Sequence, residues 1–353
     1  MKVTSGFECW VVILAGGIGS RFWPASTPNR PKQLLPLATA RPLVVDTVER
    51  ACALASTDNI LIVAGEHLRP HLAHHLPELA PEQLLCEPQA RGTAPALAWA
   101  AQEIISRSGQ AEQTVMVSLH SDHVIRPLDG FVSTLQKAMD GALGLDRLLT
   151  IGVPPSRPEI GFGYIKVGDA IGSSVLQVER FVEKPNRETA EAYLAQGDFL
   201  WNSGTFVWRP QVLIDELGAH TPELAGQLPR LSSGDTAGFF ANVPTLTIDH
   251  GLMERSSNIA VVPAEFDWDD VGSWAALMRV RELDDQGNLL VGESHAVECQ
   301  DSLLWAEDGP VVAFGLSDVV VVRSSGVTLV VPRDRAADLK TLLGELPENL
   351  REG

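Results

Sequence analysis

The sequence has few cysteines, few cations relative to its acidic residues, and no long apolar run. Its four cysteines lie far apart and form no Cys-x-x-Cys pair. A disulfide framework is therefore not indicated, and free thiols in a reducing compartment are expected. Lysine and arginine total 27 against 45 aspartates and glutamates, a formal net charge of −18. This balance argues against binding to nucleic acid or to an anionic membrane.

Transmembrane and secretory segments are not indicated either. The apolar run near the N-terminus is shorter than a signal peptide needs, and no later run could span a bilayer. We therefore expect a cytoplasmic protein. With 353 residues, of which 45% are hydrophobic, the chain can bury a full-sized core and is expected to form about two domains.

Apolar strands alternate with amphipathic helices from residue 10 to residue 153. Such alternation predicts right-handed βαβ units, and ligands of such sheets lie at the carboxyl ends of the strands. The sequence thus predicts an α/β fold with a Rossmann-like, mixed and mostly parallel sheet flanked by helices. The predicted strands are 10–15, 59–64, 84–86, 114–119 and 148–153, and the predicted helices are 43–55, 66–76, 94–105 and 128–145.

The last part of the chain has a different pattern. From Asn288 onward, short strands with turn signals replace the long elements, and a final helix is predicted at 333–343. The predicted short strands are 296–299, 303–305, 311–314, 319–322 and 328–331. We place a domain boundary near Asp284. The prediction is a larger domain at 1–284 and a small β-rich module with a terminal helix at 285–353.

The first predicted strand ends in a glycine turn, Gly16-Gly17-Ile18-Gly19, and two cations, Arg21 and Lys32, follow it. Glycines let backbone N–H groups approach a ligand, and the cations suit phosphate groups. The turn is not a P-loop, because no Gly-Lys-Ser/Thr closes it. A dinucleotide-binding fingerprint is disfavoured because Phe22 stands where glycine or alanine is needed, although Glu66 offers an acidic residue after the second strand.

Two aspartates, Asp122 and Asp270, follow predicted strands or turns, where a carboxylate often just caps a helix or makes a turn. A pair of strand-end carboxylates facing a phosphate loop is also what Mg²⁺ requires. From the residues alone, both interpretations stay open. Lys184, in Glu183-Lys184-Pro185, is similarly either a surface lysine or a point charge for a phosphate monoester.

Together these motifs resemble the sugar-phosphate nucleotidyltransferases, and Arg21-Phe-Trp-Pro with Pro31-Lys-Gln resemble more narrowly the mannose-1-phosphate guanylyltransferases. The matching motifs occur in the family's order between residues 11 and 274. They include Asp122-His123, Glu183-Lys184-Pro185 and the Asp-Val-Gly-Ser-Trp segment that begins at Asp270. The segment from Glu87 to Ala94 resembles the family's base-recognition segment, but Gly92 replaces an asparagine there. His120-Ser121 likewise replace the more usual Pro-Ala.

The resemblance implies transfer of GMP from GTP to α-D-mannose 1-phosphate, giving GDP-mannose and pyrophosphate by in-line displacement with Mg²⁺ or another divalent cation. It implies catalytic roles for Arg21, Lys32, Asp122, Lys184 and Asp270, with Asp122 and Asp270 as metal ligands. The implied nucleotide-binding residues are Leu14, Ala15, Gly16, Gly17, Gly19, Ser20, Arg21, Glu87, Pro88, Arg91, Thr93 and Ser121. The implied sugar-phosphate-binding residues are Gly163, Tyr164, Glu183, Lys184 and Asn202.

Some assignments stay open within this resemblance. For the aromatic residues Tyr164 and Trp201, packing in the core is an equal alternative to ligand contact. The resemblance implies a β-helix-like C-terminal module and a homodimer, and an end at Gly353 implies the short form without an isomerase domain. The alternative functions are a guanylyltransferase for another sugar 1-phosphate, such as a manno-heptose, and a catalytically silent regulatory homologue.

Overall fold

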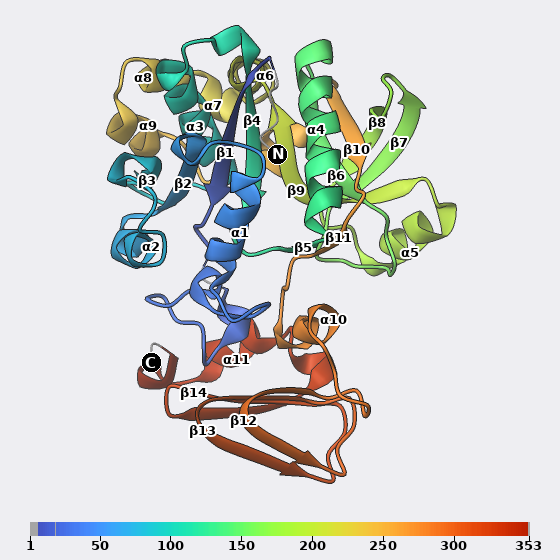
Figure 1. Ribbon diagram of the computed structural model, residues 1–353. Coiled ribbons are helices and arrows are strands. Elements are labelled where there is room, and N and C mark those ends of the chain that lie inside the picture. Colours follow the sequence, from blue (N-terminus) through green and yellow to red (C-terminus); the bar gives the residue numbers. More distant parts are fainter. Residues whose placement is uncertain (1–5, 18, 352–353) are drawn as a thin grey trace. The chain divides into compact units, whose positions relative to one another are not determined.

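The computed structural model describes residues 6–17 and 19–351, and the chain divides into two compact units that do not follow chain order (Figure 1). The first unit comprises Met1–Gly16, Thr47–Ser121 and Ile125–Trp268. The second unit comprises Gly17–Asp46, Asp122–Val124 and Asp269–Gly353. The glycine turn after the first strand thus belongs to both units, and its Ile18 lies outside the described residues.

The first unit contains a nine-stranded mixed sheet in the order β3-β2-β1-β4-β9-β6-β10-β8-β7. In β1, Val11 pairs in parallel with Ile60 of β2 and with Val117 of β4, whereas β9 runs antiparallel to β4 and β6. The predicted α/β fold with a mixed sheet is confirmed. The strands are β1 Glu8–Leu14, β2 Ile60–Gly65, β3 Leu84–Glu87, β4 Thr114–His120, β6 Leu148–Val153, β7 Tyr164–Ala170, β8 Leu176–Val182, β9 Phe199–Trp208 and β10 Ile259–Pro263.

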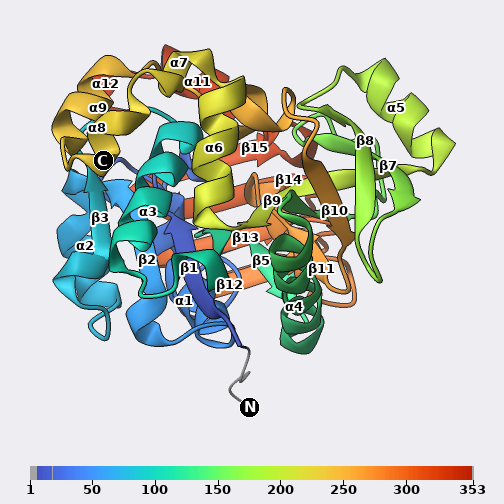
Figure 2. The same cartoon turned by 90° about the horizontal axis from the view of Figure 1, so that it is seen from above.

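Helices cover both faces of this sheet, with α3 and α6 on one face and α4 on the other (Figure 2). Their apolar faces explain the arrangement: Ala94, Leu97 and Ala101 of α3 share one buried cluster with Val12 of β1 and Leu213 of α6. The helices are α1 Leu43–Cys52, α2 Arg69–His75, α3 Thr93–Arg107, α4 Leu128–Leu145, α5 Arg187–Gln196, α6 Pro210–His220, α7 Pro222–Ala225, α8 Leu228–Ser232 and α9 Thr236–Asn242.

The second unit is built around a four-stranded sheet, β12-β13-β14-β15. Its core joins residues that are far apart in the sequence: the Phe22 and Trp274 rings lie 5.1 Å apart, and the Trp274 and Trp305 rings lie 5.2 Å apart. The Trp274 indole N–H also donates to the carbonyl of Trp23 at 3.0 Å. The elements of this part are β12 Leu289–Val297, β13 Leu303–Phe314, β14 Val319–Ser324, β15 Val327–Pro332, α10 Leu277–Val280, α11 Leu339–Glu345 and α12 Glu348–Arg351.

Several predicted elements differ from the observed ones. The expected strands 303–305 and 311–314 form one continuous strand, β13. Its first half pairs with both β12 and β14, whereas its second half pairs only with β12. Pro310 is tolerated there because proline, which has no N–H to donate, is compatible with a strand edge. The predicted helix at 333–343 is wrong in its first half. There a 3₁₀ turn, Arg333–Arg335, precedes α11, and the bend lets both Ala336 and Leu339 reach the core. A short pair of strands, β5 (Val124–Arg126) with β11 (Asp267–Asp269), was not predicted.

Among the described residues, no helix is both long enough and apolar enough to cross a membrane.

Candidate active site

The glycine turn leads into a 3₁₀ turn, Ser20–Phe22, whose N-cap residue is Gly19. Gly19 has a φ of +69°, and a Cβ built there would lie 2.2 Å from Cβ of Lys32. Only glycine fits a position that combines a left-handed conformation with such close contact. The turn therefore depends on glycine in order to lie against Lys32.

Lys32 joins three predicted catalytic segments within the second unit. Its side chain is only 6% exposed, and its Nζ donates to Asp122 Oδ2 at 2.8 Å and to the backbone carbonyl of Asp270 at 2.6 Å. The ammonium also lies 5.8 Å from the centre of the Phe22 ring. Arg21 is exposed, with its guanidinium 3.5 Å from the carbonyl of Gly272. Thus Arg21, Lys32, Asp122 and Asp270 form one cluster.

Asp270 is largely buried and lies close to two other carboxylates, an environment in which a nearby cation stabilises its ionised form. Burial raises the pKa of Asp270 to about 6; Lys32 opposes this, while the charges of Asp269 and Asp122 add to it. The following residue, Val271, has a φ of +47°, a strained conformation for a β-branched side chain. Asp269 forms an ion pair instead: both of its carboxylate oxygens accept from Arg279, at 2.6 and 3.0 Å.

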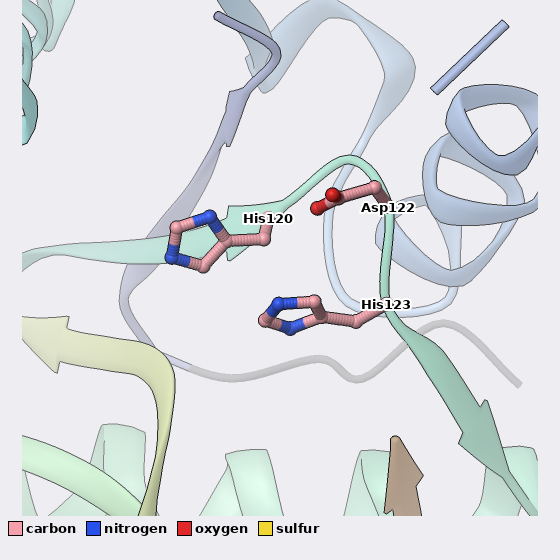
Figure 3. A group of neighbouring side chains, drawn as sticks. All are labelled: His120, Asp122 and His123. Atoms are coloured by element: carbon pink, nitrogen blue, oxygen red, sulfur yellow. The ribbon is translucent and has the colours of Figure 1, made fainter. Parts of the chain in front are cut away.

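The turn after β4 brings potential metal ligands together. His120, Asp122 and His123 each offer one ligand atom, and these atoms lie within 4.8 Å of one another (Figure 3). Imidazole nitrogens and carboxylate oxygens are ligands for divalent metals, and carboxylates suit Mg²⁺ better than imidazoles do. His120 and His123 were not predicted as ligands. The only signal for His120 was its departure from the family's usual Pro-Ala.

The predicted sugar-phosphate residues of the first unit form a second cluster. Lys184 has a φ of +47° and pairs with Oε1 of its neighbour Glu183, whose side chain is 7% exposed. A Cβ on Gly163 would lie 2.6 Å from Glu183 Oε2 and 3.2 Å from Asn202 Cβ. Gly163 thus lets Glu183 and Asn202 approach one backbone position. Tyr164, in contrast, is fully buried, with its ring 5.5 Å from that of Tyr193.

Three further residues of this cluster, Asp249, His250 and Glu254, were not predicted from the sequence. Asp249 accepts a hydrogen bond from Asn202 Nδ2 at 3.0 Å, and Glu254 Oε1 accepts from the backbone N–H of Glu183 at 2.9 Å. Glu254 also pairs with His250 at 2.8 Å. Asp249–Met253 form a π-helix, an element that often marks functional sites but that residue spacing does not predict.

The predicted nucleotide-binding residues of the first unit lie at the carboxyl ends of neighbouring strands. The backbone N–H of Ser121 donates to the carbonyl of Leu14 at 3.0 Å. Glu87 ends β3, and a Cβ on Gly16 would lie 3.8 Å from its Oε2. Burial raises the pKa of Glu87 to about 7. Glu87 is thus a half-buried carboxyl group next to Gly16, and its oxygens could accept hydrogen bonds from the N–H groups of a ligand.

The base-recognition segment is held by contacts with residues 240–248. Arg91 Nε donates to the carbonyl of Phe240 at 3.0 Å, and Thr93 Oγ1 accepts from the N–H of Ile248 at 2.8 Å. Gly92 has a φ of +82°, and a Cβ there would lie 2.5 Å from the carbonyl oxygen of Leu246. The glycine in place of asparagine is therefore explained by a close backbone approach.

Comparison with known proteins gives consistent matches over nearly the whole chain. A family model described as "Nucleotidyl transferase" matches residues 10–287, and one described as "MannoseP isomerase/GMP-like beta-helix domain" matches residues 292–346. The xanthan biosynthesis protein XanB of Xanthomonas campestris pv. campestris is 37% identical over 347 residues, which cover 95% of this chain and 72% of that protein.

Two further matches carry enzyme names. A mannose-1-phosphate guanylyltransferase of Klebsiella pneumoniae is 34% identical over 354 residues, or 96% of this chain and 74% of that protein. A crystal structure from Thermus thermophilus, titled as a mannose-1-phosphate geranyltransferase, matches with a TM-score of 0.88 and 30% identity. That match covers 96% of this chain and 99% of the solved chain.

The raised pKa of Glu87 predicts a pH-dependent stability. A carboxyl group whose pKa is raised on folding stabilises the protein at low pH, and this contribution is lost as the pH rises from about 4.3 through 7. We expect Glu87→Gln to increase the free energy of unfolding more at pH 8 than at pH 5. The difference should be about 1 kcal/mol, discounted from the full shift because the side chain is only half-buried.

Urea unfolding at both pH values measures this difference. Glu78→Gln, which changes an exposed glutamate of the same unit, is the control. An equal gain for Glu87→Gln at the two pH values would contradict the prediction.

Proposed function

Because the chain belongs to the nucleotidyl transferase family, we propose that it transfers GMP from GTP to α-D-mannose 1-phosphate, releasing pyrophosphate and forming GDP-mannose. The names of the relatives support the choice of nucleotide and sugar. The observation that carries the proposal is the cluster around Lys32, in which cations and carboxylates suited to a metal-bound triphosphate meet. Arg21 and Lys32 would neutralise the triphosphate, and the charge of the departing pyrophosphate in particular.

Asp122 and Asp270 would hold Mg²⁺ or another divalent cation. The donor set fits a cation, because Lys32 Nζ contacts Asp122 Oδ2 and the backbone of Asp270, and the charges of Lys32 and Asp122 both act on the buried Asp270 carboxyl. Bound Mg²⁺ would supply positive charge to the phosphate oxygens during the transfer. His120 and His123 lie close enough to Asp122 to join such a site.

Lys184 would hold the phosphate of the sugar 1-phosphate, which is the nucleophile. A phosphate monoester with a second pKa of about 6 is largely dianionic at neutral pH, so no general base and no covalent intermediate is needed. The side chain of Lys184 is 62% exposed, so its ammonium can reach a ligand in solution. Catalysis is then a matter of positioning and charge neutralisation.

A panel of nucleoside triphosphates and sugar 1-phosphates, scored by pyrophosphate release, tests the proposal. We expect the highest kcat/KM with GTP and mannose 1-phosphate. A clear preference for another sugar 1-phosphate would replace the proposed substrate. No pyrophosphate release with any pair would favour a catalytically silent homologue.

Asp270→Asn tests the metal-binding role. Loss of one carboxylate charge should lower kcat by about 10² to 10³, while the backbone carbonyl that Lys32 contacts stays in place. The control is Asp267→Asn, which changes an exposed aspartate three residues earlier and should leave turnover nearly unchanged. Near-normal turnover of Asp270→Asn at saturating Mg²⁺ would show that the assignment is wrong.

We also propose that the protein is a homodimer that uses the β-rich module. Val312 and Phe314 of β13 are 70% and 67% exposed, and Phe314 pairs with exposed Val297 of β12. A group of exposed apolar side chains of this kind is typical of an interaction surface. Sedimentation equilibrium should show a dimer that Phe314→Ser weakens at least tenfold, while Val330→Ser, at an exposed valine of β15, should not. A wild-type monomer at all concentrations would exclude the dimer.

A further inference from the structure

Asp249 has no assigned role, although it contacts a residue of the proposed sugar pocket. We propose that Asp249 is a positioning residue that holds one N–H of the Asn202 amide and so aims the other N–H, together with Glu183 Oε2, at a single sugar hydroxyl. The inference rests on the proposed function and adds a chemical requirement to it. The hydroxyl must accept from Asn202 and donate to Glu183 at the same time.

The orientation of the Asn202 amide follows from its partners. The backbone N–H of Gly204 can only donate, and it lies 3.2 Å from Asn202 Oδ1, which also accepts from the Thr150 hydroxyl at 2.8 Å. A carboxylate can only accept, and Asp249 Oδ1 lies 3.0 Å from Asn202 Nδ2. Oxygen and nitrogen of the amide therefore cannot be exchanged without the loss of the hydrogen bonds to both Gly204 and Asp249.

Each of the two predicted sugar-binding residues retains one unused group. Asn202 Nδ2 carries two hydrogens, and within the described part of the chain only Asp249 accepts one of them. Glu183 Oε1 binds Lys184, and no described residue donates to Glu183 Oε2. A Cβ on Gly163 would contact both Glu183 Oε2 and Asn202 Cβ, so the free acceptor and the Asn202 side chain lie beside the same backbone position.

The segment that carries Asp249 is fixed at both ends of the π-helix. Asp249 binds the Asn202 amide, and Glu254 accepts from the N–H of Glu183, so one segment supports both sugar-binding residues. Burial and the charge of Glu183 raise the pKa of Asp249 to about 6, so the group is mainly ionised at neutral pH. An ionised carboxylate makes the stronger acceptor for the amide.

Deoxy and fluoro derivatives of mannose 1-phosphate at each ring position are the probes. A fluorine replaces the acceptor but cannot donate, and a deoxy carbon does neither. For the wild type we expect one position at which both substitutions weaken binding about tenfold or more, because Glu183 Oε2 then stays buried without a donor. Calorimetry measures binding, and pyrophosphate release measures turnover.

Asp249→Ala removes the anchor of the amide. We expect it to raise the KM for mannose 1-phosphate about tenfold, to leave the KM for GTP unchanged, and to reduce the discrimination against the fluoro analogue to less than about threefold. Asp249→Asn keeps an acceptor oxygen and should restore part of the discrimination. Asp140→Ala, which removes an exposed carboxylate that accepts from Gln136 at 2.9 Å on α4, is the matched control and should behave as wild type.

The outcomes separate this inference from the proposed function. A wild-type enzyme that fails to release pyrophosphate overturns the function, whereas the binding series still tests the pocket. Equal loss of affinity for GTP and sugar in Asp249→Ala would mean a merely structural role and overturn the inference. So would a wild-type series in which no position discriminates between hydroxyl and fluorine.

Discussion

The contacts of the Lys32 ammonium are the interaction on which the second unit's part of the site depends. A lysine that is 6% exposed is stable only with partners, and here they are a carboxylate and a backbone carbonyl from two other segments. Removing one partner of a buried ion pair typically costs about 3–5 kcal/mol, because a charge is left unpaired. Gly19 is constrained in turn, since any side chain there would collide with Lys32. One buried charge thus holds the glycine turn, the strand-end aspartate and the Asp270 loop in register.

Each unit holds a buried carboxyl group of the candidate site beside a lysine. Asp270 and Asp249 both have a pKa raised to about 6, in each case chiefly by burial and further by a neighbouring carboxylate. Lys32 stands beside the first, and Lys184 acts on the second. For a chain with a net charge of −18, this local pairing is what makes anionic substrates acceptable. The global charge would repel them.

The fold class and most strands could be predicted from the sequence, because apolar runs and glycine turns are local signals. The pairing of Lys32 with Asp122 and Asp270 could not, since the three segments are far apart in the sequence and meet through one shared core that includes Phe22, Val124 and Val271. The sequence showed that Gly92 replaces an asparagine but not why, because its close approach to the Leu246 carbonyl depends on a distant segment of the chain. Asp249 gave no signal at all, as nothing in its spacing distinguishes a π-helix from an ordinary turn.

Lys184 and Val271 share a left-handed backbone conformation, each within a segment assigned here to substrate or metal binding. Such residues store about 1–2 kcal/mol each, which the surrounding structure has to supply. Directed evolution for heat resistance would therefore be drawn to Lys184, an exposed position where glycine or asparagine relaxes the backbone at once. There the gain removes the ammonium itself. Val271 is fully buried in the core of the second unit, so the same change would leave a cavity whose cost outweighs the relaxed backbone. Thermal tolerance and turnover are thus set against each other at a single residue of this chain, Lys184.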